Sequence, residues 1–128
     1  MAEHAGYHEP LDELSLAVRE RHRAIVSLME ELEAIDWYDQ RVDATSDESL
    51  RAVLAHNRDE EREHAAMTLE WLRRNDPTWD GVLRTYLFTE APITEVEAEA
   101  EEAGAGAPAP APHPAISRGA RPDEPLAP

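Results

Sequence analysis

The chain has 128 residues, contains no cysteine and carries a formal net charge of −16 at pH 7. Its length allows one modest domain at most, and the lack of cysteine excludes disulfides, iron–sulfur clusters and thiolate zinc sites. The acidic charge argues against nucleic acid and anionic membranes as partners. Because no stretch resembles a membrane span or a signal peptide, we expect a cytoplasmic protein.

The first predicted element is a long helix. Residues 1–9 are predicted to be a disordered leader, and Pro10 then opens the helical pattern. Apolar residues recur every seven positions, at Leu11, Val18, Ile25 and Leu32. This repeat predicts an amphipathic helix with a coiled-coil-like seam that runs to about Asp39.

A second long helix is expected from about Asp47 to Arg74. In the short polar connection before it, Thr45 or Ser46 can cap the helix, and Thr45 with Glu48 fits the capping-box spacing. Two long helices joined by so short a turn should lie antiparallel as a hairpin.

The C-terminal third contains weaker elements. Asp76-Pro77 begins a short helix, with an N-cap residue before a proline at the first helical position. The run ITEVEAEAEEA can form a marginal acidic helix, and residues 104–128 are Pro/Ala-rich, which predicts a disordered tail. The predicted fold is all-α, with a helical domain over residues 10–103.

The seam of the second helix is polar in its middle. In order it contains Leu50, Leu54, Asn57, Glu61, His64, Thr68 and Trp71. A buried carboxylate is costly unless something neutralises it, and Glu61 and His64, three residues apart, can both reach one cation. In a chain this rich in Glu such a pair arises about once by chance. A solvated surface pair is therefore the alternative, and the position on the seam is what favours a metal role.

Glu31 completes half of a metal site. It lies beside the seam residue Leu32 and is expected to point toward the inner edge of the hairpin. A ferritin-like di-iron site takes one Glu from each of two helices and a Glu-x-x-His pair from each of two others. Glu31, Glu61 and His64 supply half of that set, and a second copy on a two-fold axis can supply the rest. We therefore predict a homodimeric four-helix bundle around two metal ions. The donors suit iron, manganese or zinc.

Three stretches closely resemble the encapsulated ferritins, the small ferritin-like cargo proteins of encapsulin nanocompartments. They are RHRAIVSLMEELEAIDWYDQRVD, LAHNRDEEREHAAMTLEWLRRNDPTW and LRTYLFTEAPI, and the resemblance covers about residues 8–97. It implies a ferroxidase that oxidises Fe²⁺ with O₂ at a di-iron centre between two subunits. It also implies that the dimers form a ring-shaped decamer and that an encapsulin shell stores the iron mineral.

The resemblance implies roles for further residues. Tyr38, two turns from Glu31 on the same face, would lie at the centre as a ligand or beside one. Glu30 and Glu33 would form an outer metal-attracting site near Trp37, on the route inward. The alternatives are that the two aromatic residues only pack at an interface, where aromatics are enriched, and that the acidic face is only solvated.

The tail departs from the family pattern. Family members usually end in a targeting peptide of Gly-Ser-Leu character, for which Ala115–Gly119 is the only candidate here. The Pro/Ala-rich stretch before it is typical of a spacer that presents a terminal peptide.

Two other functions are compatible with the residues. One is a di-iron peroxidase or oxygenase, and the other is a non-catalytic helical adaptor that metal stabilises. The chain has no cysteine for a rubredoxin-type electron-transfer centre, and two helices per chain leave little room for a substrate pocket. These points favour the ferroxidase over the peroxidase or oxygenase, and the adaptor stays an alternative.

Overall fold

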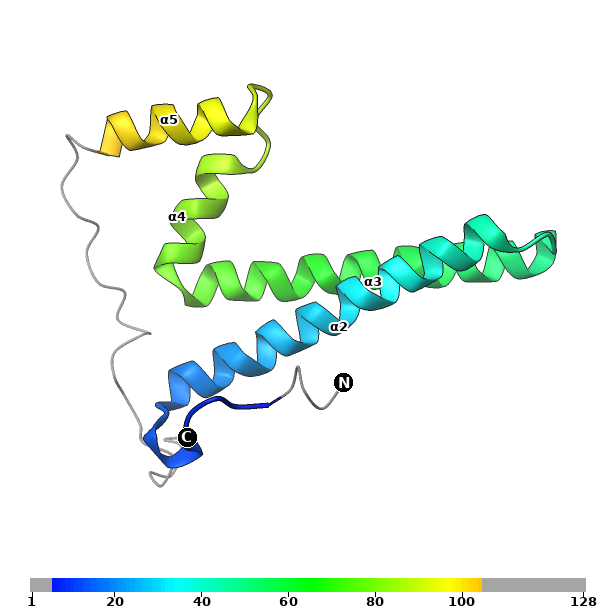
Figure 1. Cartoon of the computed structure of the whole chain (residues 1–128), viewed down its shortest axis with the longest axis horizontal. Coiled ribbons are helices and arrows are strands. Elements are labelled where there is room, and N and C mark those ends of the chain that lie inside the picture. The colour runs from blue at the N-terminus through cyan, green and yellow to red at the C-terminus, as the bar shows by residue number, and fades with distance from the viewer. Residues whose placement is uncertain (1–5, 105–128) are drawn as a thin grey trace. The chain divides into compact units, whose positions relative to one another are not determined.

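The structure is a computed structural model, and it describes residues 6–104 (Figure 1). In chain order its elements are the 3-10 helix η1 (Leu11–Glu13) and the α-helices α2 (Leu16–Ala44), α3 (Glu48–Asn75), α4 (Pro77–Tyr86) and α5 (Ile93–Gly104). This part of the chain has no strand, which confirms the all-α class. The marginal acidic run does form a helix, so two helices rather than one follow the hairpin. Within residues 6–104, no helix is both long and apolar enough to span a bilayer.

The first long helix begins at Leu16 and not at Pro10. Pro10 starts only the single turn of η1, after which Leu14 is extended. Ser15 is also extended, and its side-chain oxygen accepts a hydrogen bond from the backbone N–H of Val18 at 3.3 Å. A serine in this position satisfies one of the unpaired N–H groups of a helix start, and this cap sets the beginning of α2.

The cap of α3 also differs from the prediction. The helix α2 continues past Asp39 to Ala44, and a short connection leads to α3. Asp47 is the residue that caps α3, because its Oδ1 accepts a hydrogen bond from the N–H of Leu50 at 3.0 Å. The predicted Thr45 cap is wrong, since Thr45 Oγ1 accepts from the N–H of Asp47 at 3.2 Å.

Arg51 ties the start of α3 to the end of α2. Its Nε donates to the carbonyl oxygen of Val42 at 3.0 Å, and its guanidinium also donates to the carbonyl of Thr45 and the carboxylate of Glu48. The carbonyl groups at a helix end lack partners within the helix, and here one side chain satisfies two of them. Glu48 therefore pairs with Arg51 and does not form the predicted capping box with Thr45.

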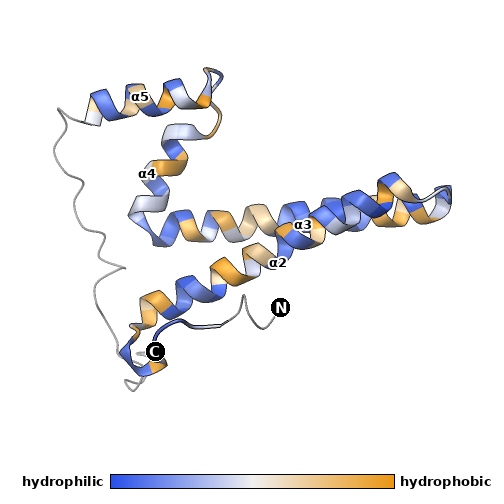
Figure 2. Ribbon diagram, viewed as in Figure 1, coloured by the Kyte–Doolittle hydropathy of each residue, from blue (hydrophilic) through white to orange (hydrophobic). Residues whose placement is uncertain are grey.

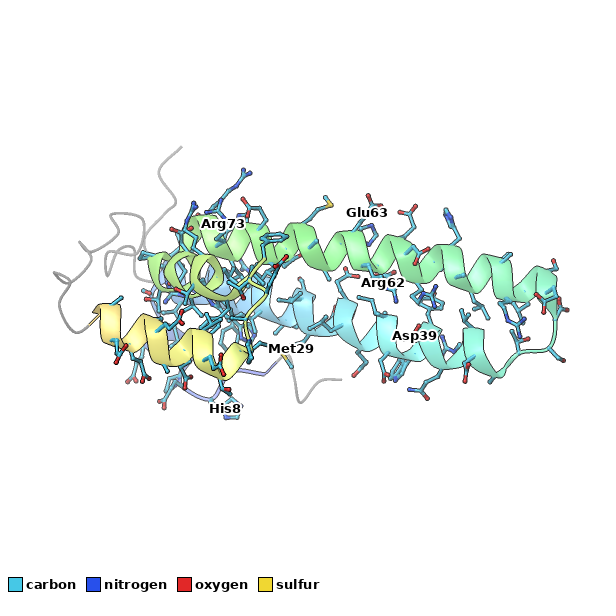
Figure 3. All side chains as sticks on the ribbon, turned by 90° about the horizontal axis from the view of Figure 1, so that it is seen from above. His8, Met29, Asp39, Arg62, Glu63 and Arg73 are labelled. Carbon is cyan, nitrogen blue, oxygen red and sulfur yellow. The ribbon has the colours of Figure 1, made fainter. Side chains whose placement is uncertain are left out.

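The helices α2 and α3 lie side by side and antiparallel, as the hairpin prediction required (Figures 1 and 3). Asp39 of α2 forms an ion pair with Arg58 of α3 at 2.8 Å. Further from the connection, Glu31 of α2 lies 3.8 Å from His64 of α3. Residue numbers thus fall along α2 as they rise along α3, which is the mark of an antiparallel pair.

The buried line of α3, meaning the buried residues along that helix, is shifted by one position in the sequence from the predicted seam. Among the described residues the buried hydrophobic side chains are Ala65, Leu72 and Val96. Ala65 and Leu72 each follow a predicted seam residue, His64 and Trp71, and so lie about 100° further around the helix. Trp71 remains 40% exposed. The residues of the predicted seam therefore lie beside the buried residues of α3 and stay partly exposed.

The heptad positions of α2 are also exposed in the single chain. Large apolar side chains stay accessible at Val18, Ile25 and Leu32. Figure 2 shows hydrophobic residues recurring along α2 between hydrophilic ones. Recurring exposed apolar side chains of this kind are typical of a surface that packs against another chain.

The described residues fall into two units, 6–71 and 72–104. In the second unit α4 contacts α5. Asp76 caps α4 as predicted, because its Oδ1 accepts hydrogen bonds from the N–H groups of Thr78 at 3.0 Å and Trp79 at 3.4 Å. Pro77 occupies the first turn of α4.

Part of the predicted leader is described. The ring of Tyr7 stacks on the ring of His22 of α2, with centroids 4.1 Å apart. Residues 1–5 and 105–128 lie outside the described residues. The disordered tail and the Ala115–Gly119 segment therefore stay predictions.

Candidate metal centre

Three polar side chains come together across the hairpin. They are Glu31 of α2 and Glu61 and His64 of α3, and one ligand atom from each lies within 4.8 Å of the others. Nδ1 of His64 is 3.6 Å from Oε2 of Glu61 and 3.8 Å from Oε2 of Glu31. The structure thus brings together the three residues predicted as ligands from their spacing. Their role as ligands stays a prediction.

The local sequence explains the convergence. Glu61 and His64 are three residues apart on α3, so their side chains lie on one helix face about one turn apart. The antiparallel hairpin then places Glu31 of α2 opposite them. The hydroxyl of Thr68, another polar residue of the predicted seam, donates to the carbonyl of His64 at 3.0 Å. Thr68 is therefore hydrogen-bonded within its own helix.

The electrostatics of the cluster favour a positive charge. The side chains of Glu31 and Glu61 are 25% and 26% exposed, and that of His64 is 47% exposed. The hydrogen bond to Glu61 raises the pKa of Glu31, burial and the charge of Glu61 raise it further, and His64 acts in the opposite direction. Two carboxylates this close repel each other when both are ionised, so a cation bound between them would stabilise the cluster.

The donor set fits a transition-metal ion. Two carboxylates and one imidazole suit iron, manganese or zinc rather than copper(I). Within residues 6–104 this is the one group of three or more such side chains with ligand spacing. Because only one face of the hairpin supplies the ligands, an ion held here keeps coordination positions open for further donors.

A hollow of about 520 Å³ lies near the connection between α2 and α3 and is lined by Asp36, Asp39, Gln40, Val42, Asp43, Arg51 and Arg58. None of the three cluster residues lines it. Sites for organic ligands are mostly apolar, so the three converging polar side chains of the cluster suit a small ion better than an organic substrate.

The other predicted site residues lie on α2, outside the group of converging ligand atoms. Tyr38 is half-buried, and the guanidinium of Arg41 lies 5.6 Å from its ring centroid. Glu30 and Trp37 are exposed and Glu33 is half-buried. Seven residues separate Glu30 from Trp37, which puts both on one face of α2.

The sequence analysis missed an ionic network between the cluster and the connection. Arg58 of α3 donates to Asp39 of α2 at 2.8 Å, and Arg62 lies 3.9 Å from the same carboxylate. Arg62 also donates to Asp59 at 3.0 Å. The spacing of Asp59 and Arg62 was the only visible signal. No local rule links Asp39 to Arg58, because they lie on different helices.

A helical hairpin that presents a Glu from one helix and a Glu-x-x-His pair from the next has half of the donor set of the ferritin-like di-iron proteins. The EncFtn-like family matches residues 6–90 of the chain. The chain therefore belongs to the EncFtn-like family, which confirms its resemblance to the encapsulated ferritins.

Relatives and a solved structure agree with this assignment. The chain is 72% identical over 90 residues to the "Encapsulated ferritin-like protein" of Rhodospirillum rubrum, over 70% of this chain and 64% of that one. It thus spans less than two thirds of that relative. It is 64% identical over 91 residues to the "Ferritin-like protein" of Thermotoga maritima, over 71% and 80% of the two chains. The crystal structure of protein ne0167 from Nitrosomonas europaea matches with a TM-score of 0.67 and 64% identity, over 69% of this chain and 97% of that one.

Proposed function

We propose that the chain is a ferroxidase, which oxidises Fe²⁺ to Fe³⁺ with O₂ at a di-iron site shared between two subunits. The observation that carries the proposal is the convergence of Glu31, Glu61 and His64 across the hairpin, with ligand atoms within 4.8 Å of one another. Membership of a ferritin-like family supports an iron-related role.

A second copy of the chain completes the proposed site. Three ligands are half of a ferritin-like set, and a two-fold axis would place a second Glu31, Glu61 and His64 opposite the first. Trp71, seven residues after His64 and so on the same face of α3, is 40% exposed in the single chain. An exposed aromatic on the same helix face as the ligands is what such an interface would cover. Assembly of the dimers into a ring-shaped decamer is part of the proposal.

The chemistry balances with iron and O₂ alone. Each Fe²⁺ gives up one electron, so two Fe²⁺ and two protons convert one O₂ into hydrogen peroxide, and four Fe²⁺ with four protons convert it into two waters. Four glutamates from two chains neutralise two Fe²⁺, and hard carboxylate oxygens favour Fe³⁺ over Fe²⁺. The pKa of Glu31 is raised by its hydrogen bond to Glu61, and a cation bound in the cluster would favour the ionised form of both carboxylates.

Four residues of α2 have secondary roles in the proposal. Tyr38 lies seven residues after Glu31 on the same helix face and would be a ligand or contact one. Glu30 and Glu33, with Trp37, would form an outer site that attracts Fe²⁺ before it reaches the centre. Their support is the exposure of Glu30 and Trp37 and the shared face of the helix.

The proposed setting is the interior of an encapsulin shell in the cytoplasm, where the oxidised iron would be stored as mineral. The name of the Rhodospirillum rubrum relative, an encapsulated ferritin-like protein, supports this setting.

Aerobic addition of Fe²⁺ to the full chain, followed by ferric absorbance, tests the proposal. The wild-type protein should oxidise iron faster than buffer alone. Glu31→Ala, Glu61→Ala and His64→Ala should each slow the reaction at least about tenfold, with unchanged helix content by circular dichroism. A protein-free rate for the wild type would favour the non-catalytic adaptor, and much faster oxidation with peroxide than with O₂ would favour the peroxidase.

Matched controls come from the same helix. Glu63 projects from the side of α3 that faces away from α2 (Figure 3). His56 is exposed and lies 3.5 Å from Glu60 of its own helix. Glu63→Ala and His56→Ala should keep the wild-type rate. If the three ligand variants also oxidise iron at the wild-type rate, the assignment of the site to Glu31, Glu61 and His64 is wrong.

A further inference from the structure

We propose that Asp39 and Arg58 are positioning residues, which hold α2 and α3 in the register that brings Glu31 opposite Glu61 and His64. The inference rests on the proposed function in one respect, because it takes that cluster to be a metal site.

The two residues belong to a closed network of four charges. Arg58 donates to Asp39 across the hairpin at 2.8 Å and lies 3.5 Å from Asp59 of its own helix. Arg62 donates to Asp59 at 3.0 Å and lies 3.9 Å from Asp39. Figure 3 shows Asp39 and Arg62 in the space between the two helices. Two carboxylates and two guanidinium groups make the network neutral, and Arg58 is only 20% exposed.

The network lies next to the metal cluster along the hairpin. Arg58 precedes Glu61 by three residues, which is about 4.5 Å along the axis of α3. Asp39 follows Glu31 by two turns of α2. The interhelical ion pair is therefore close enough to fix the axial position of α2 relative to α3 at the cluster.

Apolar packing leaves this register weakly specified. Within residues 6–71 Ala65 is the one buried hydrophobic side chain, and others such as Leu28 and Leu54 are only half-buried, so apolar packing constrains sliding less than a fully buried core would. A charged pair with hydrogen-bond geometry can be made in one register only, and fixing register is the best-attested use of polar groups between helices. A slip of one residue moves a helix by about 1.5 Å, which would spread ligand atoms that now lie within 4.8 Å.

Titration of the full chain with Co²⁺, followed by its visible absorption, tests the inference. Asp39→Asn and Arg58→Gln should each raise the Kd for Co²⁺ at least about tenfold and change the Co²⁺ spectrum, with unchanged helix content. The double variant should lose no more affinity than the worse single variant, because the two residues act as a pair. Additive losses, or wild-type affinity in both single variants, would overturn the inference.

Asp36→Asn is the matched control. Asp36 lies one turn before Asp39 and accepts a hydrogen bond at 3.1 Å from Gln40 of the same helix, so its loss should leave the Kd unchanged. If Asp39→Asn loses helix, Asp39→Glu provides the second test. It keeps the charge and should bind Co²⁺ within about threefold of wild type, whereas a loss equal to that of the Asn variant would contradict the pairing.

The same experiment separates this inference from the proposed function. If Glu31→Ala abolishes Co²⁺ binding but the wild type does not oxidise iron, the ferroxidase fails while the Asp39 and Arg58 variants still decide the inference. If iron is oxidised and those variants bind Co²⁺ normally, only the inference fails. Wild-type Co²⁺ binding by Glu31→Ala would overturn both.

Discussion

Nδ1 of His64 on α3 lies 3.8 Å from Oε2 of Glu31 on α2. The imidazole is also 3.6 Å from Glu61 of its own helix, so it lies within reach of both carboxylates of the cluster. Neither helix presents this group alone. The cluster exists only when the hairpin is closed, and the stability of the hairpin and the binding of a cation must therefore depend on each other.

Glu31→Gln should stabilise the metal-free protein at pH 7. The pKa of Glu31 is raised chiefly by its hydrogen bond to Glu61, so the stability it contributes is present below its unfolded pKa and is lost as pH rises through its folded pKa. The Gln variant has no charge beside Glu61, with which Glu31 shares a cluster of ligand atoms within 4.8 Å of one another, and the repulsion that this removes is about 1 kcal/mol in a water-like dielectric. Urea unfolding in the presence of a chelator should show a gain of that order, which shrinks as pH falls through the folded pKa of Glu31 and vanishes below its unfolded pKa.

With metal bound, the effect of Glu31→Gln on the free energy of unfolding should change sign. In the presence of Co²⁺ the wild type should be more stable than Glu31→Gln, because only the wild type keeps the full ligand set and binding stabilises the folded state. A variant that is less stable than wild type with and without metal would contradict the repulsion between Glu31 and Glu61.

Metal should drive association of the chain. If two copies share the site, sedimentation velocity at fixed protein concentration should show a larger species when Fe²⁺ or Co²⁺ is added anaerobically. Glu61→Ala should not show it, because it lacks a carboxylate from each half of the site. Glu63→Ala keeps the cluster and should associate like the wild type. A metal-loaded monomer would be decisive against a shared centre.

Asp80→Asn should destabilise the second unit in a pH-dependent way. Hydrogen bonds from Arg73 and then Arg84 lower the pKa of Asp80, so its stabilising effect is present above its unfolded pKa and is lost as pH falls through its folded pKa. The thermal midpoint of the variant should lie below that of the wild type at pH 7, and the two should converge below about pH 3. A difference that is the same at every pH would point to lost packing instead of lost charge.

Local rules predicted much of the fold. The heptad repeat and the short connection gave the hairpin, and Asp76-Pro77 gave the start of α4, because each depends on residues close in sequence. The same rules failed at the caps, where Ser15 and Asp47 act in place of Pro10 and Thr45. Several residues near each helix start could serve as a cap, and only the backbone geometry selects one of them.

Interhelical relationships were predicted only where a pattern pointed to them. The Glu-x-x-His spacing led to Glu61 and His64 because both residues are on one helix. The rotation of the buried line to Ala65 and Leu72 could not be seen, since an apolar stripe read from sequence does not say which chain covers it. The pairing of Asp39 with Arg58 was also missed. It depends on the register between two helices, which a sequence pattern within one helix does not show.

Phe88→Gly should stabilise the chain slightly. Phe88 follows the last residues of α4 with a φ of 61°, a left-handed conformation that is usually taken by glycine after a helix. The strain is about 1–2 kcal/mol for a residue with a Cβ, and the greater backbone freedom of unfolded glycine offsets about 0.5–1 kcal/mol of the relief. The ring is 101% exposed, so its removal loses no burial. Urea unfolding should show a net gain of about 0.5 kcal/mol.

Phe88→Ala is the matched control for this prediction. It removes the same ring but keeps the Cβ, and the left-handed strain should therefore remain. If both variants gain equally, the benefit comes from removing the ring and not from relaxing the backbone. If the glycine variant is less stable than the wild type, the ring of Phe88 must contribute to stability through a contact that the single chain does not contain, because within the single chain it is fully exposed.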